Sequence, residues 1–525
     1  MKLAPTLTVA AVLAVLQLGH CVPFEGNATR KANPQLLSTS KPATIHKATA
    51  KPGDTITDKS SSSCVVVLKE SENRPWETIL DKMGWGENIK ETNWRGGSKR
   101  DEIRTDPFED SRYFTTSTGR EMRVFGGGEG TMRVLSMNMT KLEIDRVGSL
   151  EYVDFVGKND ITFSEPIVEE PTGPNENPGP VVAPSPKMAP RPGYSEETFP
   201  TEGLECGSKR FDGRNLPIIE QCGAPWGLER ISSNKIPPSQ PPAYADQISM
   251  KYSYKFRERA GYGVDIYIVD GAVDLGHSDF EERAESLWRR PDAWDREKFN
   301  SREHGTLVAA IAAGRNYGVA KAAEIFSVPI FGDDDRDYLM DGINAVMRRH
   351  SRRLRDTDFA GSVVNLSLAT GLVDSEDAVL LPYEKSIIRM SEKGIHVIIA
   401  AGNYKTDACL ERPARLSRQS NVISVGAVDF ANRRHESSNW GECVDIYAPG
   451  NNVISAYAGT RDGWIVSGAT SLAAPHVAGV VAAELTSHPK YKLDPAGMKE
   501  HILNIAVEVE MEGKDEHILL LNNGC

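Results

Sequence analysis

Short, continuous runs of hydrophobic residues punctuate the second half of the chain and are rich in Val and Ile. They occupy residues 264–270, 324–331, 362–369, 396–403 and 421–429. Such runs, without a polar residue at every second position, are typical of strands buried on both faces of a parallel sheet. Between them lie longer segments with helical spacing, including 340–354 and 382–394. Strands that alternate with helices predict a layered α/β domain with a mostly parallel sheet, whose site lies beyond the carboxyl ends of the strands.

The first half of the chain has a different pattern. Residues 1–21 combine a basic start with an apolar stretch and small residues at its end, as secretory signal peptides do. A polar leader covers residues 22–63, and the apolar run CVVVLKE then opens a domain-sized α+β piece, residues 64–165. Residues 166–205 are dense in proline and poor in large apolar side chains, so they are predicted to be a linker. The α/β domain takes residues 206–525.

Composition excludes two classes of partner. The 525 residues include 73 Asp and Glu against 61 Lys and Arg, which gives a net charge of -12. This balance argues against a nucleic-acid surface built on bulk positive charge. After the signal peptide no segment has the length of apolar sequence that a membrane helix needs, so no membrane span is predicted.

Four polar residues stand where the layered fold places function. Asp270 ends a hydrophobic run, while His304 and Ser471 each stand near the start of a helix-like segment. In a nucleophilic relay, an imidazole takes the serine proton while a carboxylate fixes the imidazole tautomer. Backbone N–H groups at a helix start, and the side chain of Asn403 at the end of another run, could bind an oxyanion. Taken singly, each residue also fits an ordinary cap, turn or buried polar position.

Six strings in order resemble the subtilisin-like serine proteases, within them the proteinase K and fungal cerevisin branch. They are VDIYIVDGAVDLGHSDFEERA (264–284), HGTLVAAIAAGRNYGVAKAAEI (304–325), VVNLSL (363–368), IIAAGN (398–403), SSNWGECVDIYAPGNNVISA (437–456) and SGATSLAAPHVAGVVAAEL (467–485). The resemblance implies a three-layer subtilase fold. It also implies that Asp270, His304 and Ser471 are the catalytic triad and that Asn403 is the oxyanion donor.

The same resemblance carries further expectations. Ser367, Leu368 and Ala369 correspond to a substrate-binding edge that pairs with an extended peptide. Residues 64–165 resemble the inhibitor-like propeptide of the family, which blocks the cleft until it is removed. The implied protein is therefore a secreted serine endopeptidase, made as a zymogen and expected to be a monomer that cleaves polypeptides. Delivery to a vacuole through the secretory pathway is an alternative destination. No cofactor is required, and calcium is possible as a structural ion.

Several glycines of the family pattern are replaced in this chain. The replacements are Ala272 in DGA, Leu307 and Ala310 in HGTLVAA, Ala369 and Thr370 in SLAT, and Ala469 in ATSLA, with Leu307 standing for a histidine. Added side chains at positions where backbones pass closely can shift local geometry. The alternative is therefore a subtilase-fold protein with impaired or lost catalysis that binds peptides.

Cysteines and sequons complete the predictions. The segments around Cys409 and Cys443 resemble the paired segments of some proteinase K-like enzymes, which implies a bridge between them, while Cys206 with Cys222 is a second possibility and Cys525 has no assigned partner. The cysteines lack the close paired spacing of zinc ligands, so no metal site is predicted. Asn27 and Asn138 fit the glycosylation pattern. Asn365 fits it too, but lies in a hydrophobic run and is expected to be inaccessible. The basic run 348–355 is interpreted as a solvated helix end.

Overall fold

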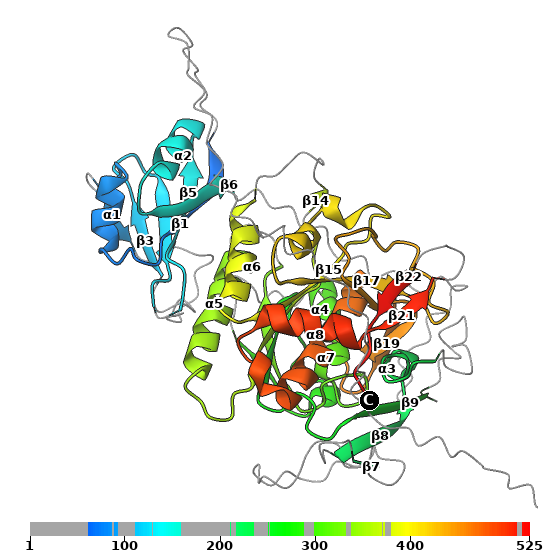
Figure 1. Ribbon diagram of the computed structural model, residues 1–525. Coiled ribbons are helices and arrows are strands. Elements are labelled where there is room, and N and C mark those ends of the chain that lie inside the picture. The colour runs from blue at the N-terminus through cyan, green and yellow to red at the C-terminus, as the bar shows by residue number, and fades with distance from the viewer. Residues whose placement is uncertain are drawn as a thin grey trace, which may run out of the picture.

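Two larger sheets organise the described part of the chain (Figure 1). The computed structural model describes residues 61–86, 89–92, 111–128, 130–158, 210–211, 217–235, 250, 252–287, 299–331, 338–369, 371–372, 380–511 and 517–525. The predicted signal peptide, nearly all of the polar leader with Asn27, and the proline-rich linker lie outside these residues. Among the helices that are described, none has the length and apolar character needed to cross a bilayer.

The N-terminal unit is a six-stranded antiparallel sheet in the order β2-β3-β4-β5-β1-β6 with two helices. Its elements are β1 (Ser62–Leu68), α1 (Trp76–Lys82), β2 (Lys90–Thr92), β3 (Arg112–Thr115), β4 (Glu121–Phe125), β5 (Val134–Met139), α2 (Lys141–Gly148) and β6 (Val153–Lys158). Strand β1 therefore begins two residues before the start predicted for this unit. Asn138 lies exposed on β5, which is compatible with the predicted glycosylation.

Both faces of this small sheet are covered, which explains the unbroken hydrophobic run of β1. Cys64, Val66 and Leu68 pack with α1 and α2 on one face. Val65 and Val67 point to the other face and join a hydrophobic cluster with helices α5 (Tyr338–Arg353) and α6 (Pro382–Glu392). Figure 1 shows the blue-to-cyan N-terminal unit against these two yellow-green helices. The unit therefore docks on the outer surface of the larger domain.

The large sheet has nine strands in the order β11-β12-β10-β13-β15-β17-β18-β22-β21, parallel except for the last pair. These strands are β10 (Val264–Asp270), β11 (Ala284–Ser286), β12 (Glu324–Pro329), β13 (Gly361–Leu366), β15 (His396–Ala400), β17 (Ile423–Val428), β18 (Ile446–Pro449), β21 (Val507–Glu510) and β22 (His517–Leu520). The five hydrophobic runs correspond to β10, β12, β13, β15 and β17, as predicted. The expected α/β architecture is confirmed.

Helices cover both faces of the large sheet and make three layers. Ile266 and Ile268 of β10 pack in a cluster with α4 (Phe299–Ala313), α7 (Thr470–Ser487) and α8 (Pro495–Ile505). Tyr267 and Val269 point the other way and pack with α5 and α6. Helix α7 is buried along nearly its whole length, as expected for a helix that is apolar all round. It is the central element of its layer.

Smaller elements surround this core. They are β7 (Arg210–Phe211), β8 (Pro217–Ala224), β9 (Tyr252–Arg257), β14 (Gly371–Leu372), β16 (Glu411–Arg412), β19 (Val453–Ala456), β20 (Trp464–Ser467), helix α3 (Trp226–Ile231) and the short 3₁₀ turns η3 (Ser278–Phe280), η4 (Ala408–Leu410), η5 (Ala414–Arg418) and η6 (Pro489–Tyr491). Strands β7, β8 and β9 form one sheet, while β14 pairs with β16 and β19 with β20.

Candidate active site

Asp270 is the last residue of β10, at the carboxyl end of a strand inside the large sheet. Its side chain is fully buried, and Oδ1 accepts a hydrogen bond of 2.6 Å from the Gly271 N–H. The same oxygen lies 2.8 Å from Nδ1 of His304, which α4 supplies. The sheet edge where function was expected therefore brings these two predicted residues into direct contact.

The contact depends on how closely α4 approaches the end of β10. A Cβ built on Gly305 would lie 2.4 Å from the carbonyl oxygen of Gly271 and 2.6 Å from that of Ala272. Any side chain at position 305 would therefore push the helix away from the strand. Glycine after His304 is what lets the imidazole reach the carboxylate of Asp270.

Ser471 is the second residue of α7, and its side chain is buried. Its neighbour Leu472 packs in one cluster with Leu307 of α4, so the helix segments that carry Ser471 and His304 lie against each other. Neither Ser471 Oγ nor His304 Nε2 has a hydrogen-bond partner within the part of the chain that the structure describes. Buried polar atoms are rarely left without partners, and here two such atoms belong to a hydroxyl and an imidazole. A hydroxyl and an imidazole of this kind are the groups that a nucleophile and its general base require.

Asn403 lies just beyond β15 and contacts the start of α7. Its Oδ1 accepts hydrogen bonds from the N–H of Thr470 at 3.0 Å and from the Thr470 hydroxyl at 2.8 Å. Because the amide nitrogen lies on the opposite side of the planar group, Nδ2 is turned away from Thr470 and can donate elsewhere. Asn403 therefore caps the helix of Ser471 in addition to carrying a donor, a second role that sequence reasoning missed.

Asn439 is a buried residue that fixes the loop of Asn403, and sequence reasoning did not find it. Its Oδ1 accepts from the N–H groups of Tyr404 at 3.0 Å and Thr406 at 3.1 Å, and its Nδ2 donates to the Ala401 carbonyl at 2.9 Å. Gly402 has a φ of 97°, and a Cβ there would lie 2.4 Å from Asn439 Nδ2. The segment AAGN thus needs its glycine both for the backbone angle and for this contact.

The first two side chains of the predicted substrate-binding edge, those of Ser367 and Leu368, are buried in the protein. The Ser367 hydroxyl accepts a hydrogen bond from Asn365 Nδ2 and donates one to the carbonyl of Ser471, each at 2.8 Å. Both Asn365 and Ser367 are buried, which confirms that the sequon at Asn365 is inaccessible. Leu368 is buried in the cluster beneath α5 and α6, and Ala369 is half-buried. The Ser367 side chain therefore positions the backbone of Ser471.

Two of the replaced positions of the family pattern, Ala469 and Leu307, lie in the same cluster in the structure. Ala469 has a φ of 178°, which is extended backbone that any residue adopts. Its methyl group is buried in a cluster that also contains Leu307 and Trp226. The leucine that replaces a histidine and the alanine that replaces a glycine thus pack into the same hydrophobic contact. Thr370 lies outside the described residues.

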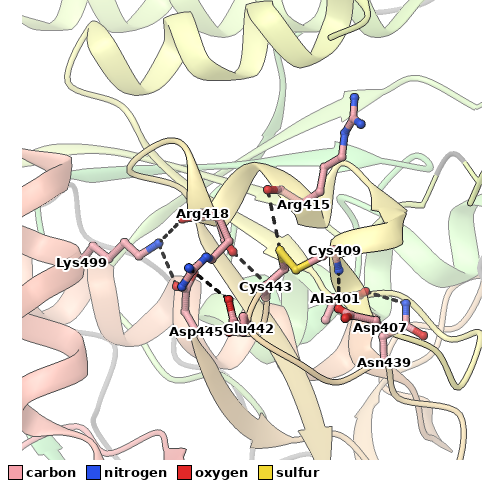
Figure 2. Close-up of a disulfide and its surroundings, with 11 residues drawn as sticks. Ala401, Asp407, Cys409, Arg415, Arg418, Asn439, Glu442, Cys443, Asp445 and Lys499 are labelled. Atoms are coloured by element: carbon pink, nitrogen blue, oxygen red, sulfur yellow. Dashed lines mark hydrogen bonds and ion pairs between the residues drawn. A yellow bond between two sulfur atoms is a disulfide. The ribbon is translucent and has the colours of Figure 1, made fainter. Parts of the chain in front are cut away.

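A disulfide fastens the segment beyond Asn403. Cys409 and Cys443 are bonded, with their Cα atoms 5.1 Å apart, which confirms the predicted bridge. Figure 2 shows the bridge beside Asp407 and Asn439, whose side chains hold the same loop. Cys222 also takes part in a disulfide. Its predicted partner, residue 206, lies outside the described residues.

The charge on α7 near Ser471 is set by burial. Burial lowers the pKa of His476 to about 4, although a hydrogen bond between its Nδ1 and the Leu472 carbonyl, at 2.9 Å, acts in the opposite direction. His476 is therefore neutral at neutral pH and adds no positive charge one helical turn beyond Ser471.

Comparison with known proteins identifies relatives of the larger domain. Residues 261–519 match the subtilase family. Subtilisin-like protease 3 of Saccharomyces cerevisiae is 33% identical over 315 residues, which cover 57% of this chain and 62% of that protein. Cerevisin of the same yeast is 33% identical over 274 residues, 51% of this chain and 40% of cerevisin. The chain thus spans less than two thirds of either relative. A solved structure of a cold adapted subtilisin-like serine proteinase is 29% identical, with a TM-score of 0.45 over 57% of this chain and 98% of that one.

Proposed function

Residues 261–519 belong to the subtilase family, and from this premise we propose that the chain is a serine endopeptidase that cleaves polypeptides. The observation that carries the proposal is the buried 2.8 Å contact between Asp270 and His304 on a helix that packs against the helix of Ser471, whose hydroxyl has no partner among the described residues. An imidazole held on one side by a carboxylate and open on its other nitrogen is the arrangement of a general base.

Each residue has one role in the proposed reaction. His304 Nε2 takes the proton from Ser471 Oγ as the oxygen attacks the scissile carbonyl. Asp270 holds the Nδ1–H tautomer and stabilises the imidazolium that forms. Asn403 Nδ2 and the Ser471 N–H donate hydrogen bonds to the oxyanion, and the positive end of the α7 dipole adds to this stabilisation. His304 then protonates the leaving amine, and water releases the acyl group by the same steps. The chemistry needs no cofactor, and calcium stays a possible structural ion.

We further propose that the N-terminal unit is the inhibitor of a zymogen. It is held to α5 by an ion pair of 2.7 Å between Arg123 and the buried carboxylate of Asp341 and by a hydrogen bond of 3.0 Å from the Met132 N–H to Asn344. In this full chain Ser471 is 2% exposed, so a peptide cannot reach its hydroxyl unless something moves. Removal of the N-terminal unit with the linker would accompany activation in the secretory pathway or after export.

The direct test is labelling by a serine-directed fluorophosphonate. We expect the processed protein to be labelled at Ser471 and the Ser471→Ala variant to remain unlabelled and to release no propeptide. Ser467→Ala is the matched control, since Ser467 is also buried, lies four residues away and has a hydroxyl without a partner among the described residues. It should label like the wild type. If folded, processed wild type and Ser471→Ala are both unlabelled, the peptide-binding alternative replaces the enzyme.

A further inference from the structure

A second cluster of titratable side chains lies at the opposite end of α7 from Ser471. Glu484 stands in the last turns of α7, His488 directly follows the helix, and His501 comes from α8. His488 Nδ1 lies 2.9 Å from Glu484 Oε2, and His501 Nε2 lies 2.7 Å from the same oxygen. The three ligand-type atoms are all within 4.8 Å of one another. Nothing in the proposed protease reaction uses these residues.

The donor atoms and the exposure of the cluster favour a transition-metal ion as its ligand. Two imidazole nitrogens and one carboxylate oxygen form a donor set preferred by zinc and its transition-metal neighbours, whereas calcium and magnesium prefer oxygen alone. Glu484 is buried, while the side chains of His488 and His501 are 15% and 17% exposed. An ion can therefore approach from solvent on the imidazole side and keep water at its remaining positions.

Neighbouring side chains hold the donors in place. Arg257 donates to the other Glu484 oxygen, Oε1, at 2.8 Å, which leaves Oε2 facing the two imidazoles. The His501 ring stacks on Tyr491, with ring centroids 5.1 Å apart, and lies 4.8 Å from the ring of His488. Such outer contacts orient the ligands of protein metal sites and adjust their affinity.

We propose that Glu484, His488 and His501 bind a divalent transition-metal ion of the zinc type, with water completing a tetrahedral site. Ligand atoms around such an ion lie roughly 3.3 Å apart, given bonds of about 2.0 Å. The two nitrogens therefore retreat from Oε2 by a few tenths of an ångström as the ion enters between them. Each imidazole binds through the nitrogen that now faces Glu484 and carries its proton on the other nitrogen.

The ion would tie the end of α7 to α8 and, through Arg257, to β9. It would stabilise the helix that carries Ser471 without contacting the reacting atoms. Cysteine spacing gives no signal for this site, because its ligands are two histidines and a glutamate, from the end of α7 and from α8, that only the fold brings together.

The test uses the full chain with Ser471→Ala in every sample, so that self-cleavage does not change the protein. Zn²⁺ affinity is measured by competition with a chromophoric chelator, and Co²⁺ is used as a spectroscopic probe. We expect one Zn²⁺ per chain and the visible absorption bands of tetrahedral Co²⁺. His488→Ala and His501→Ala should each weaken binding at least about tenfold, and the double variant should remove it.

His517→Ala is the matched control, since His517 is exposed on β22, away from the cluster. It should bind Zn²⁺ like the parent. Circular dichroism and thermal melting without metal establish that each variant is folded. If an alanine variant does not fold, the His501→Asn variant is measured in its place. Added Zn²⁺ should raise the melting temperature of the parent and of His517→Ala but not that of the double variant. Absence of saturable binding by the parent, or binding that survives in the double variant, would overturn the proposal.

Discussion

Helix α7 carries buried polar groups at both ends, and their hydrogen bonding differs. Near its start, Ser471 Oγ and His304 Nε2 have no partner among the described residues. Near its end, the Glu484 carboxylate receives Arg257 on one oxygen and His488 and His501 on the other. Leaving a buried polar group unpaired costs about 1–3 kcal/mol. The start of α7 is therefore stabilised by other contacts and not by hydrogen bonds of these two groups. The end that we propose to be reactive has polar groups without hydrogen-bond partners among the described residues, whereas the polar groups at the other end are paired.

Electrostatics sharpen the same contrast. Burial alone would raise the pKa of Glu484, but the hydrogen bonds from His488 and His501 and the charge of Arg257 hold that pKa well below its usual range. Glu484 therefore stays ionised in the fold, and its contribution to stability is present above its unfolded pKa, near 4.5, and is lost only in stronger acid.

The largest expected effect comes from breaking the reactive end. If His304 is the general base that we propose, His304→Ala should lower kcat by about 10⁶-fold, the scale found on removing the corresponding residue from subtilisin, a protease of the family that residues 261–519 match. Asp270→Asn should cost about 10⁴-fold, because the wrong imidazole tautomer is then favoured. The free energy of unfolding should hardly change in Ser471→Ala, since Ser471 Oγ has no partner to lose among the described residues. Steady-state kinetics and chemical denaturation of the processed protein measure the two quantities; a large loss of stability with kcat intact would reverse our assignment of the two ends.

At the other end the expected loss is one of stability. Glu484→Gln keeps the shape of the side chain but removes the negative charge that faces the Arg257 guanidinium, which is only 10% exposed. Breaking one partner of a buried ion pair costs about 3–5 kcal/mol. Guanidinium unfolding measures this loss, and Glu508→Gln, an exposed glutamate on β21, is the control that should change nothing. At temperatures where Glu484→Gln is still folded, its kcat should match that of the wild type. A kcat loss greater than tenfold would mean that the two ends of α7 are not separable.

Asn403 allows the two kinds of role to be separated within one residue. Asn403→Asp keeps the oxygen that accepts from Thr470 but loses the Nδ2 donor, whereas Asn403→Ala loses both. Both variants should lower kcat by about 10²–10³-fold through the oxyanion. The alanine variant alone should lose a further ~1 kcal/mol of stability, because the helix cap is gone. If the aspartate variant keeps full kcat, Asn403 is a cap and not an oxyanion donor.

Most of the large domain could be predicted because a buried parallel strand needs nothing beyond a short hydrophobic run. Strands β10 and β15 end within a few residues of the predicted limits. The basic run 348–355 ends helix α5, as predicted, and Arg352 and Arg355 are exposed, but the run is not solvated throughout. Arg349 and Arg353 lie 2.9 and 3.4 Å from the buried carboxylate of Asp265, and His350 is buried. Charge patterning describes a helix surface in water and contains no information on a strand residue 84 positions away.

The candidate site divides in the same way. Asp270, His304 and Ser471 are placed by strand ends, helix starts and short motifs, which the sequence displays locally. The roles of Asn439 and of the Ser367 side chain are not displayed locally in the sequence. Both side chains form hydrogen bonds with backbone groups that come near them only in the folded chain. An asparagine between a serine and a tryptophan looks like any turn residue until its three backbone partners are seen.

A pH dependence also distinguishes the two ends of α7. Burial lowers the pKa of His350, His396 and His476 to about 4, from 6.5 in the unfolded chain. Because the unfolded chain therefore binds protons first, the free energy of unfolding is highest above pH 6.5 and decreases as the pH falls toward 4. Between pH 7.5 and pH 5.5 each should cost about 1.3 kcal/mol, about 4 kcal/mol together. Glu484 contributes nothing over this range, because it is ionised in both the folded and the unfolded chain.

Guanidinium unfolding of the Ser471→Ala chain at the two pH values measures this drop. His476→Gln, in the Ser471 half of α7, should remove about a third of it, since one of three buried neutral imidazoles is gone. Glu484→Gln should lower the stability equally at both pH values and leave the drop unchanged. A drop that vanishes in Glu484→Gln and persists in His476→Gln would place the acid sensitivity of α7 at the end we assign to stability, and the division between the two ends would have to be redrawn.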